Sequence, residues 1–302
     1  MKPKVTIGVC VRNGAATLRE AIESIICQDY PHGFMEVIFV DDGSEDETLS
    51  IVKSYVPKMD MEVKVFHHEW KGLGYSRNVV VAEARGDFIV WVDGDMVLSR
   101  DFVSKLVEFM EQHPKAGIVK GKQSLQPGGN MLATLEAYSR AVGRMVDYQS
   151  EKARSKSLGT GGAIYRLEAI KQIGGFDENL RGYGEDSDVE VRLRMNGWSL
   201  ATTDAFFLDY ERLKLTWKTL WSRYWLRGYY MHYFLHKNKR FVKHFRMFPP
   251  AAFFLGFLHA NKLFQMTRKK AVFLLPFQYV FKMTAWYIGF INSHMNSRGA
   301  RI

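Results

Sequence analysis

Two aspartates on either side of a glycine, Asp93-Gly94-Asp95, follow an apolar run that begins at residue 87. The glycine lets both carboxylates face one hard cation, such as Mg²⁺ or Mn²⁺, and lets a diphosphate approach closely. A cation held there would neutralise a diphosphate and make it a better leaving group. The alternative is a turn with two solvated acids, and one such tripeptide does not decide between them.

A second acidic pair, Asp41-Asp42, ends the apolar run 36–42. An aspartate at the end of a strand, beside the start of a helix, can accept hydrogen bonds from a nucleotide base or ribose. The alternative is helix capping by Asp42 or Ser44, because Ser44 and Glu47 have the spacing of a capping box. Both interpretations stay open for this pair.

Four acids crowd the start of a predicted helix in the third motif: Glu185, Asp186, Asp188 and Glu190. The helix dipole favours negative charge at that end, which accounts for one or two of them. Four acids after a Gly-Tyr-Gly indicate a site, in which one carboxylate acts as general base towards an acceptor hydroxyl.

Alternating strands and helices must position these motifs. Strand-like runs cover 5–11, 36–42, 62–68 and 87–95, and helix-like runs at 15–28, 43–55 and 74–86 lie between them. Repeated units of this length imply an α/β fold, with a mainly parallel sheet and helices on both faces. Ligands of such sheets bind beyond the carboxyl ends of the strands, where the first two acidic motifs lie.

The formal net charge of +10 is unevenly distributed over the 302 residues. Residues 1–200 hold 25 Lys and Arg against 29 Asp and Glu, whereas residues 201–302 hold 17 against 3. Of the 42 aromatic residues, 25 lie in that last third. Basic charge with aromatics is typical of proteins that bind nucleic acid or an anionic membrane surface. The hydropathy of residues 201–302, the tail, distinguishes between these two partners.

Two apolar blocks in the tail, 251–266 and 271–291, favour a membrane partner and no nucleic acid. The second block has 21 residues, about the length that crosses a ~30 Å bilayer core, although Lys282 interrupts it. The sequence leaves open whether the two blocks cross the bilayer, dip into it or lie on it. We expect a catalytic domain at 1–213 and a basic, aromatic-rich, helical, membrane-associating region at 214–302.

Other features exclude several classes of protein. Two cysteines, Cys10 and Cys27, provide neither a disulfide framework nor a cysteine-built zinc site. The phosphate loops GxGxxG after a strand and GxxxxGK[ST] do not occur. A glycine-rich segment, 159–162, can cradle a phosphate or form a tight turn. The first residues run straight into a strand-like segment without a signal-peptide pattern, so we expect the catalytic domain on the cytoplasmic side of the membrane.

The three acidic motifs, taken in order, resemble those of family 2 glycosyltransferases with the GT-A fold. The matching stretches are VTIGVCVRNGAATLREAIESIICQDYP, EVIFVDDGSEDETLSIV, GYSRNVVVAEARGDFIVWVDGD, GTGGAIYRLEAIKQIGGFDENL and GEDSDVEVRLRMNGW. The ordered set is much more specific than any one member. The resemblance implies a Rossmann-like sheet, a nucleotide-diphosphate-sugar donor and a divalent metal, Mg²⁺ or Mn²⁺.

The resemblance also implies roles for individual residues. Asp186 matches the family's catalytic base, and Asp95 and Asp93 match its metal-binding DXD motif. The donor-binding residues implied are Cys10, Val11, Arg12, Asn13, Asp41, Asp42, Arg77, Asp93, Gly94, Gly161, Gly162 and Glu185.

The chain departs from the family pattern at three places. Many relatives carry Thr/Ser-Tyr-Asn where Val11-Arg12-Asn13 stands, so only the backbone contacts of that loop carry over. Asp209 stands where related enzymes often place a metal-binding histidine, and is either a metal ligand or a surface acid. Processive synthases carry Q-x-x-R-W, whereas the segment 221–228 has no such glutamine pattern, which favours transfer of a single sugar.

These features predict an inverting transferase that moves one sugar from a UDP- or GDP-sugar to a hydroxyl of a lipid-linked or glycan acceptor at a membrane. Asp186 would deprotonate the hydroxyl, which attacks the anomeric carbon as the diphosphate leaves from the opposite face. One alternative is a polyprenyl (dolichyl) phosphate sugar synthase, whose anionic acceptor needs little deprotonation. An alternative of another class is a non-catalytic, membrane-surface scaffold that retains a nucleotide-binding shell.

Overall fold

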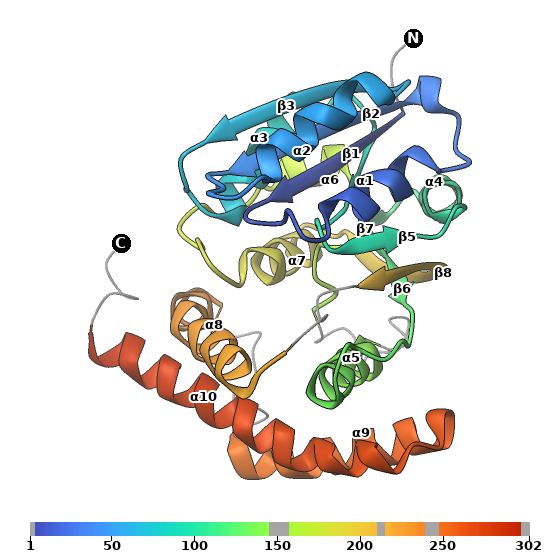
Figure 1. The fold of residues 1–302 in the computed structure, drawn as a ribbon. Helices are drawn as coiled ribbons and strands as arrows, with labels where there is room; N and C mark the ends of the chain where they lie inside the picture. The colour runs from blue at the N-terminus through green and yellow to red at the C-terminus, as the bar shows by residue number, and fades with distance from the viewer. Residues whose placement is uncertain (1–3, 145–156, 210–214, 239–247, 297–302) are drawn as a thin grey trace. The chain divides into compact units, whose positions relative to one another are not determined.

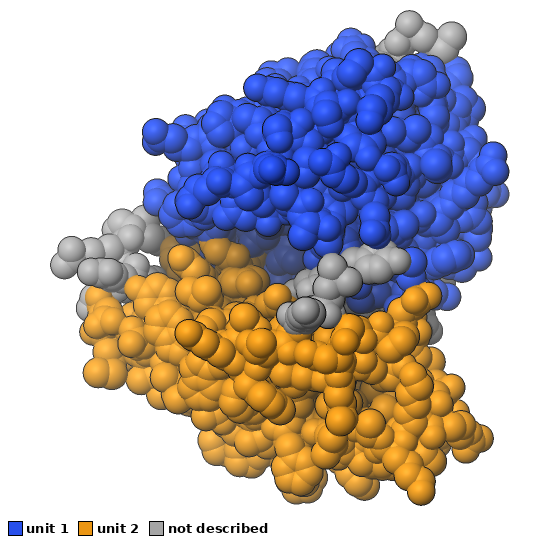
Figure 2. Space-filling view, in the orientation of Figure 1, with its two compact units in different colours: residues 1–124, 147–181, 185–211 blue, residues 125–146, 182–184, 212–302 orange. Residues whose placement is uncertain are grey.

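The chain divides into two compact units (Figure 2). The computed structural model describes residues 4–144, 157–209, 215–238 and 248–296. The sheet unit comprises Met1–Ser124, Asp147–Arg181 and Glu185–Glu211, and the helical unit comprises Leu125–Val146, Gly182–Gly184 and Arg212–Ile302. The sequence predicted one boundary at 213, a position outside the described residues. Two earlier segments, 125–146 and 182–184, also belong to the helical unit, because they contact residues of that unit that are distant in sequence.

An eight-stranded sheet forms the centre of the sheet unit (Figure 1). Its strands are β1 (Val5–Val11), β2 (Met35–Asp42), β3 (Glu62–His68), β4 (Phe88–Trp91), β5 (Met96–Leu98), β6 (Ala116–Gln123), β7 (Ala163–Arg166) and β8 (Ser199–Asp209), in the order β3-β2-β1-β4-β7-β6-β8-β5. The pairs β1–β2, β2–β3, β1–β4 and β6–β8 are parallel. The pairs β4–β7, β6–β7 and β5–β8 are antiparallel. The expected α/β fold with a mainly parallel sheet is confirmed.

Six helices of the described residues pack on this sheet. They are α1 (Leu18–Ile26), α2 (Thr48–Tyr55), α3 (Leu73–Glu83), α4 (Phe102–Gln112), α6 (Leu167–Gln172) and α7 (Glu185–Met195), with short 3-10 turns η1 (His32–Phe34) and η2 (Val56–Lys58). Phe39 of β2 belongs to the same buried cluster as Ile22 of α1, Ile51 of α2 and Leu106 of α4. All eight residues of β2 are buried. Because successive side chains of a strand point to opposite faces, β2 is covered on both sides.

The capping box predicted from Ser44 and Glu47 is wrong. Helix α2 begins at Thr48, and the side chain of its N-cap residue, Glu47, makes no capping hydrogen bond. The Ser44 hydroxyl instead donates a hydrogen bond to Asp41, and Asp46 accepts one from the Thr48 N–H at 3.0 Å. Ser44 therefore bonds to the end of β2, and not to the helix as the local sequence pattern predicted.

The described residues of the helical unit form α5 (Met131–Arg144), α8 (Trp217–Lys237), α9 (Pro249–Thr267), η5 (Lys270–Leu274) and α10 (Leu275–Met295). Helices α8 and α10 approach each other closely at two glycines. A Cβ at Gly228 would overlap the carbonyl oxygen of Trp286, and a Cβ at Gly289 would overlap that of Trp225. The absence of side chains at these two positions therefore sets the distance between the helices.

A buried ion pair joins α5 to α10. The Lys282 ammonium donates to Glu136 Oε2 at 2.9 Å, and Tyr224 on α8 donates to Glu136 Oε1 at 3.0 Å. Burial alone raises the pKa of Glu136, but Lys282 outweighs it and lowers that pKa to about 2. The lysine that interrupts the second apolar block thus lies inside the protein. Within the described ranges, no helix combines the length and the apolar character that a bilayer crossing requires.

Candidate active site

The pair Asp41-Asp42 lies at the carboxyl edge of the sheet. Strands β1, β2 and β4 are parallel, so their carboxyl ends meet at one edge. Asp41 is only 1% exposed, and its Oδ2 lies 2.7 Å from Nδ1 of His67, its neighbour on β3. Its other oxygen accepts the hydrogen bond from Ser44. The carboxylate of Asp41 is thus held by two side chains of the edge itself.

Asp42 anchors the turn that leads into α3. Its Oδ1 accepts a hydrogen bond from the Lys71 N–H at 2.8 Å, and its Oδ2 accepts one from the Gly72 N–H at 3.1 Å. Nδ1 of His68 lies 3.5 Å from the same carboxylate. A hydrogen bond of Asp42 to the base or ribose of a nucleotide stays a prediction. The structure adds that this carboxylate orients the helix that carries Arg77.

The segment after β1 borders the same edge. Asn13 adopts a left-handed backbone, with φ of 51°, and its side-chain oxygen accepts a hydrogen bond from the Glu45 N–H at 2.8 Å. The Arg12 guanidinium lies 5.5 Å from the ring centroid of Trp70, an indole that is 44% exposed. An exposed aromatic face can stack a base. Trp70 was not predicted as a site residue, because the tertiary fold alone brings it to Arg12.

Cys10 and Val11 end β1 next to the Asp-Gly-Asp turn. A Cβ at Gly94 would lie 3.0 Å from the Val11 side chain, and the Thr17 hydroxyl donates to the Gly94 carbonyl at 2.8 Å. Burial raises the pKa of the Cys10 thiol to about 12. This thiol is therefore neutral at physiological pH and is no nucleophile.

The Asp-Gly-Asp motif forms the turn between β4 and β5. Asp93, Gly94 and Asp95 are all half-buried. Met96, the next residue, pairs with Asp209 at the end of β8. The fold therefore brings Asp209 to the strand that leaves this turn. Carboxylate oxygens at such a turn suit Mg²⁺ or Mn²⁺, and these three aspartates remain the predicted ligands.

A glycine-rich loop before β7 contacts two of the acidic motifs. A Cβ at Gly161 would overlap the carboxylate of Asp93, and a Cβ at Gly159 would lie 3.4 Å from Oδ2 of Asp186. The Lys120 ammonium donates to the carbonyl of Gly159 at 3.2 Å and also to that of Gly161. One loop thus lies against a predicted metal ligand and against the predicted base.

Gly162 and Lys120 fix this loop to the sheet. The Gly162 N–H donates to the Trp91 carbonyl at 2.8 Å, and the Gly162 carbonyl accepts from the Gly121 N–H at 3.0 Å. Lys120 is 3% exposed, although lysines are rarely buried. Lys120 was not predicted as a site residue, because a lysine within a strand pattern gives no sign that its side chain turns inward.

Arg77 and Glu185 form a buried ion pair at the start of α7. Arg77 Nη1 donates to Glu185 Oε1 at 2.6 Å, and the two residues are 5% and 4% exposed. The guanidinium lies 5.4 Å from the ring centroid of Phe176. Burial alone lowers the pKa of Arg77, but Glu185, Asp93 and Asp186 outweigh it and raise that pKa. The predicted contacts of Arg77 and Glu185 with the nucleotide stay predictions.

Asp186 is half-buried between two glutamates that titrate near neutrality. Burial, followed by repulsion from Asp186, raises the pKa values of Glu185 and Glu190 to about 7. Oε1 of Glu190 accepts hydrogen bonds from the N–H groups of Leu158 and Gly159, each at 2.8 Å. The two glutamates thus lie close enough to Asp186 for its charge to act on both of them.

The order of the strands and the acidic residues at the carboxyl edge of the sheet agree with the GT-A fold. Residues 6–174 match the family model "Glycosyl transferase family 2", and the chain belongs to that family. The resemblance inferred from the motifs is thereby confirmed.

Curated relatives match parts of the chain. Poly(ribitol-phosphate) beta-N-acetylglucosaminyltransferase TarS of Staphylococcus aureus is 32% identical over 110 residues, which are 36% of this chain and 19% of TarS. Poly-beta-1,6-N-acetyl-D-glucosamine synthase of Staphylococcus epidermidis is 23% identical over 212 residues, which are 68% of this chain and 47% of the synthase. The chain thus spans about a fifth and about half of the lengths of these two relatives.

Solved structures share the fold over nearly the whole chain. A mannosyltransferase of Pyrobaculum calidifontis, in complex with GDP-Man and Mn²⁺, superposes with a TM-score of 0.69 at 18% identity, covering 99% of this chain and 89% of that one. Residues 1–349 of S. aureus TarS, in complex with UDP-GlcNAc, give a TM-score of 0.56 at 17% identity, covering 97% and 92%. At these identities the likeness shows the GT-A fold.

Proposed function

We propose that the chain is an inverting glycosyltransferase that moves one sugar from a UDP- or GDP-sugar to a hydroxyl of a lipid-linked or glycan acceptor at a membrane. The observation that carries the proposal is the glycine-rich loop, in which Gly161 lies against Asp93 and Gly159 lies near Asp186. Sugar transfer needs a metal-binding carboxylate beside the donor diphosphate and a basic carboxylate beside the acceptor hydroxyl. Both must therefore lie close to the sugar that is transferred. The donors bound in the two solved structures, GDP-Man and UDP-GlcNAc, support the donor class.

The donor end of the site would use the turn after β4. Asp95 and Asp93, with Asp209 on the neighbouring strand, would hold Mg²⁺ or Mn²⁺. When bound, the metal supplies positive charge that neutralises the leaving diphosphate. The Asp93 carboxylate lies where a side chain at Gly161 would stand, so only glycine at this position lets the carboxylate keep its place.

The acceptor end would use Asp186. Its carboxylate takes the proton of the acceptor hydroxyl while the hydroxyl oxygen bonds to the anomeric carbon. The bond from that carbon to the diphosphate breaks on the opposite face, which inverts the configuration. The ion pair of Arg77 with Glu185 fixes the first turn of α7 and so orients Asp186.

The membrane part of the proposal rests on exposed apolar side chains of α9 and α10, here called the α9–α10 surface. Its members are Phe253, Phe254, Phe257 and Leu258 on α9, and Phe277, Tyr287, Ile288, Ile291 and Met295 on α10. The rings of Phe253 and Phe277 contact each other at a centroid distance of 5.9 Å, so the two helices contribute to one surface. Large exposed apolar patches mark interaction sites, and adjacent basic residues favour anionic lipid. The basic run 268–270 lies between the two helices.

The direct test replaces the base. We expect Asp186→Asn to lower sugar transfer at least about 100-fold and to leave Mn²⁺-dependent binding of the nucleotide unchanged. Asp204→Asn, on an exposed residue of β8, serves as the control and should behave like the wild type. Near-normal transfer by Asp186→Asn would remove Asp186 from the role of base. Transfer only to a polyprenyl phosphate would favour the polyprenyl phosphate sugar synthase, and no turnover of any UDP- or GDP-sugar would favour the scaffold.

A further inference from the structure

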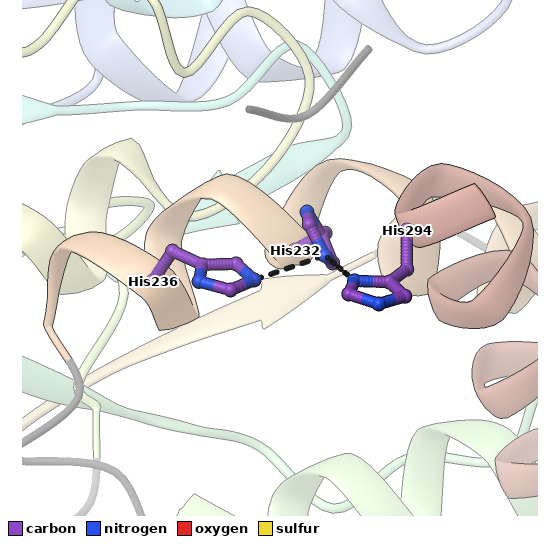
Figure 3. Close-up of side chains that lie close together, drawn as sticks. All are labelled: His232, His236 and His294. Atoms are coloured by element: carbon purple, nitrogen blue, oxygen red, sulfur yellow. Dashed lines mark hydrogen bonds between the residues drawn. The ribbon is translucent and has the colours of Figure 1, made fainter. Parts of the chain in front are cut away.

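Three histidines of the helical unit converge on one point (Figure 3). His232 and His236 are one turn apart on α8, and His294 lies in the last turn of α10. Each offers one ring nitrogen, and these nitrogens all lie within 4.8 Å of one another. None of the three is an acidic residue of the candidate active site, so the proposed function leaves this cluster unexplained.

The spacing of the nitrogens suits a metal ion better than hydrogen bonds. Nε2 of His232 lies 3.0 Å from Nδ1 of His294 and 3.0 Å from Nε2 of His236. A single ring nitrogen carries either one hydrogen or one in-plane lone pair, so Nε2 of His232 cannot form two good hydrogen bonds at once. A tetrahedral Zn²⁺ with Zn–N distances near 2.0–2.1 Å holds its nitrogen ligands roughly 3.3 Å apart. The two separations from Nε2 of His232 are within a few tenths of an ångström of that value, and the third, between His236 and His294, is at most 4.8 Å.

The helices hold the histidines in place. Positions i and i+4 of a helix lie on the same face, which sets the pair on α8. The close approach of α8 to α10 at Gly228 and Gly289 brings His294 to this pair, because each glycine lies about one turn before the histidines of its helix. His232 is 1% exposed, whereas the other two histidines are exposed and can be reached by a metal from solvent.

We propose that His232, His236 and His294 bind one divalent transition-metal ion of the Zn²⁺ type, which links α8 to the end of α10. Imidazole nitrogens are preferred ligands of Zn²⁺, whereas Mg²⁺ and Mn²⁺ prefer oxygen. The ion at this site is therefore different in kind from the one predicted at the aspartates. By binding the folded helical unit, it stabilises the contact between the two helices.

The test uses the full-length protein, stripped of metal with a chelator and kept in excess Mg²⁺ to saturate the carboxylates. We expect one equivalent of Zn²⁺ to bind and to raise the melting temperature. His236→Ala and His294→Ala should each weaken Zn²⁺ binding at least tenfold and abolish the rise, while the metal-free proteins melt like the wild type. The two exposed histidines are chosen because replacing buried His232 can also disturb folding.

His113→Ala is the matched control, since His113 is an exposed histidine at the end of α4. It should bind Zn²⁺ like the wild type. Co²⁺ gives a second measurement, because three imidazole ligands in a tetrahedral site produce strong visible absorption bands. The proposal is overturned if the double variant His236→Ala/His294→Ala binds Zn²⁺ as tightly as the wild type, or if His113→Ala loses as much affinity.

Discussion

Arg77 and Glu185, which lie 108 residues apart in the chain, form an ion pair with 2.6 Å between Nη1 and Oε1. Both side chains are 6% exposed, and the second oxygen of Glu185 has no hydrogen-bond partner among the described residues. The pair links α3, which Asp42 orients, to α7, which carries Asp186. The end of β2 is thus linked to α7 through α3, by the hydrogen bonds of Asp42 before that helix and by the ion pair of Arg77 within it.

We expect Arg77→Met to destabilise the sheet unit strongly. The variant leaves Glu185 buried without its cation, and because its pKa, already about 7, then rises further and the carboxyl can be protonated, the loss of unfolding free energy is at most about 3–5 kcal/mol. Denaturant unfolding measures this loss. Lys105→Met, which breaks the exposed pair with Asp101, is the control and should have a much smaller effect. Equal losses in the two variants would show that the Arg77 pair contributes no more than a surface pair.

Glu190 should make stability depend on pH. Its folded pKa of about 7 is above the value of an unfolded glutamate, so the folded protein binds more protons between about pH 4.5 and 7. Stability from this group is full below that range and is lost as pH rises through it, by at most about 1.4 kcal/mol per pH unit. Glu190→Gln should flatten the decrease in unfolding free energy between pH 5 and 8. An unchanged slope, equal to that of the exposed control Glu168→Gln, would contradict the raised pKa.

Gly161→Ala should weaken donor binding without unfolding the protein. The new methyl group would overlap the Asp93 carboxylate and displace it. We expect Mn²⁺-dependent binding of the nucleotide sugar to weaken about 10- to 100-fold, as for other changes beside metal ligands. Titration calorimetry measures the affinity. Gly33→Ala, where no atom lies within 4 Å of the added Cβ, is the control. Wild-type affinity in Gly161→Ala would remove Asp93 from the donor site.

Lys282→Met should destabilise the helical unit. Glu136 would keep its buried position without the ammonium group that lowers its pKa, which costs about 3–5 kcal/mol. Thermal unfolding followed by circular dichroism measures the change. The double variant Glu136→Gln/Lys282→Met should recover part of the loss, because it leaves no unpaired charge. If the double variant is less stable than Lys282→Met, the two residues do not act as a pair.

The α9–α10 surface should bind anionic membranes. Phe254 and Leu258 are 70% and 64% exposed, and insertion of either side chain into lipid removes apolar area from water. Phe254→Asp/Leu258→Asp should lower partitioning onto vesicles that contain phosphatidylglycerol at least about tenfold. Vesicle sedimentation measures partitioning, with Met195→Asp as the control, because Met195 is 66% exposed in the sheet unit. Equal partitioning of both variants would place the membrane contact elsewhere or exclude it.

Local patterns were sufficient for the elements and for the family. The runs 5–11 and 62–68 coincide with β1 and β3, because a strand's apolar pattern depends on residues close in sequence. The same holds for the order of the acidic motifs, which led to the family that the family model confirms. The capping box at Ser44 failed because the hydroxyl oxygen accepts a hydrogen bond from the Asn13 N–H at 2.9 Å, 31 residues away, while the hydroxyl donates to Asp41.

The sequence by itself therefore determined the α/β fold, the family and the acidic residues that carry the proposed chemistry. Only the tertiary structure decided which distant groups meet: Lys120 under the glycine-rich loop, Lys282 against Glu136, and His294 beside the two histidines of α8. The physical reason is range. Strand and helix patterns repeat every few residues, whereas a buried charge or a shared metal needs partners that the chain brings back from up to 146 residues away. The excess of basic and aromatic residues in 201–302 coincides with the exposed apolar side chains of α9 and α10, which lie within the same third of the chain.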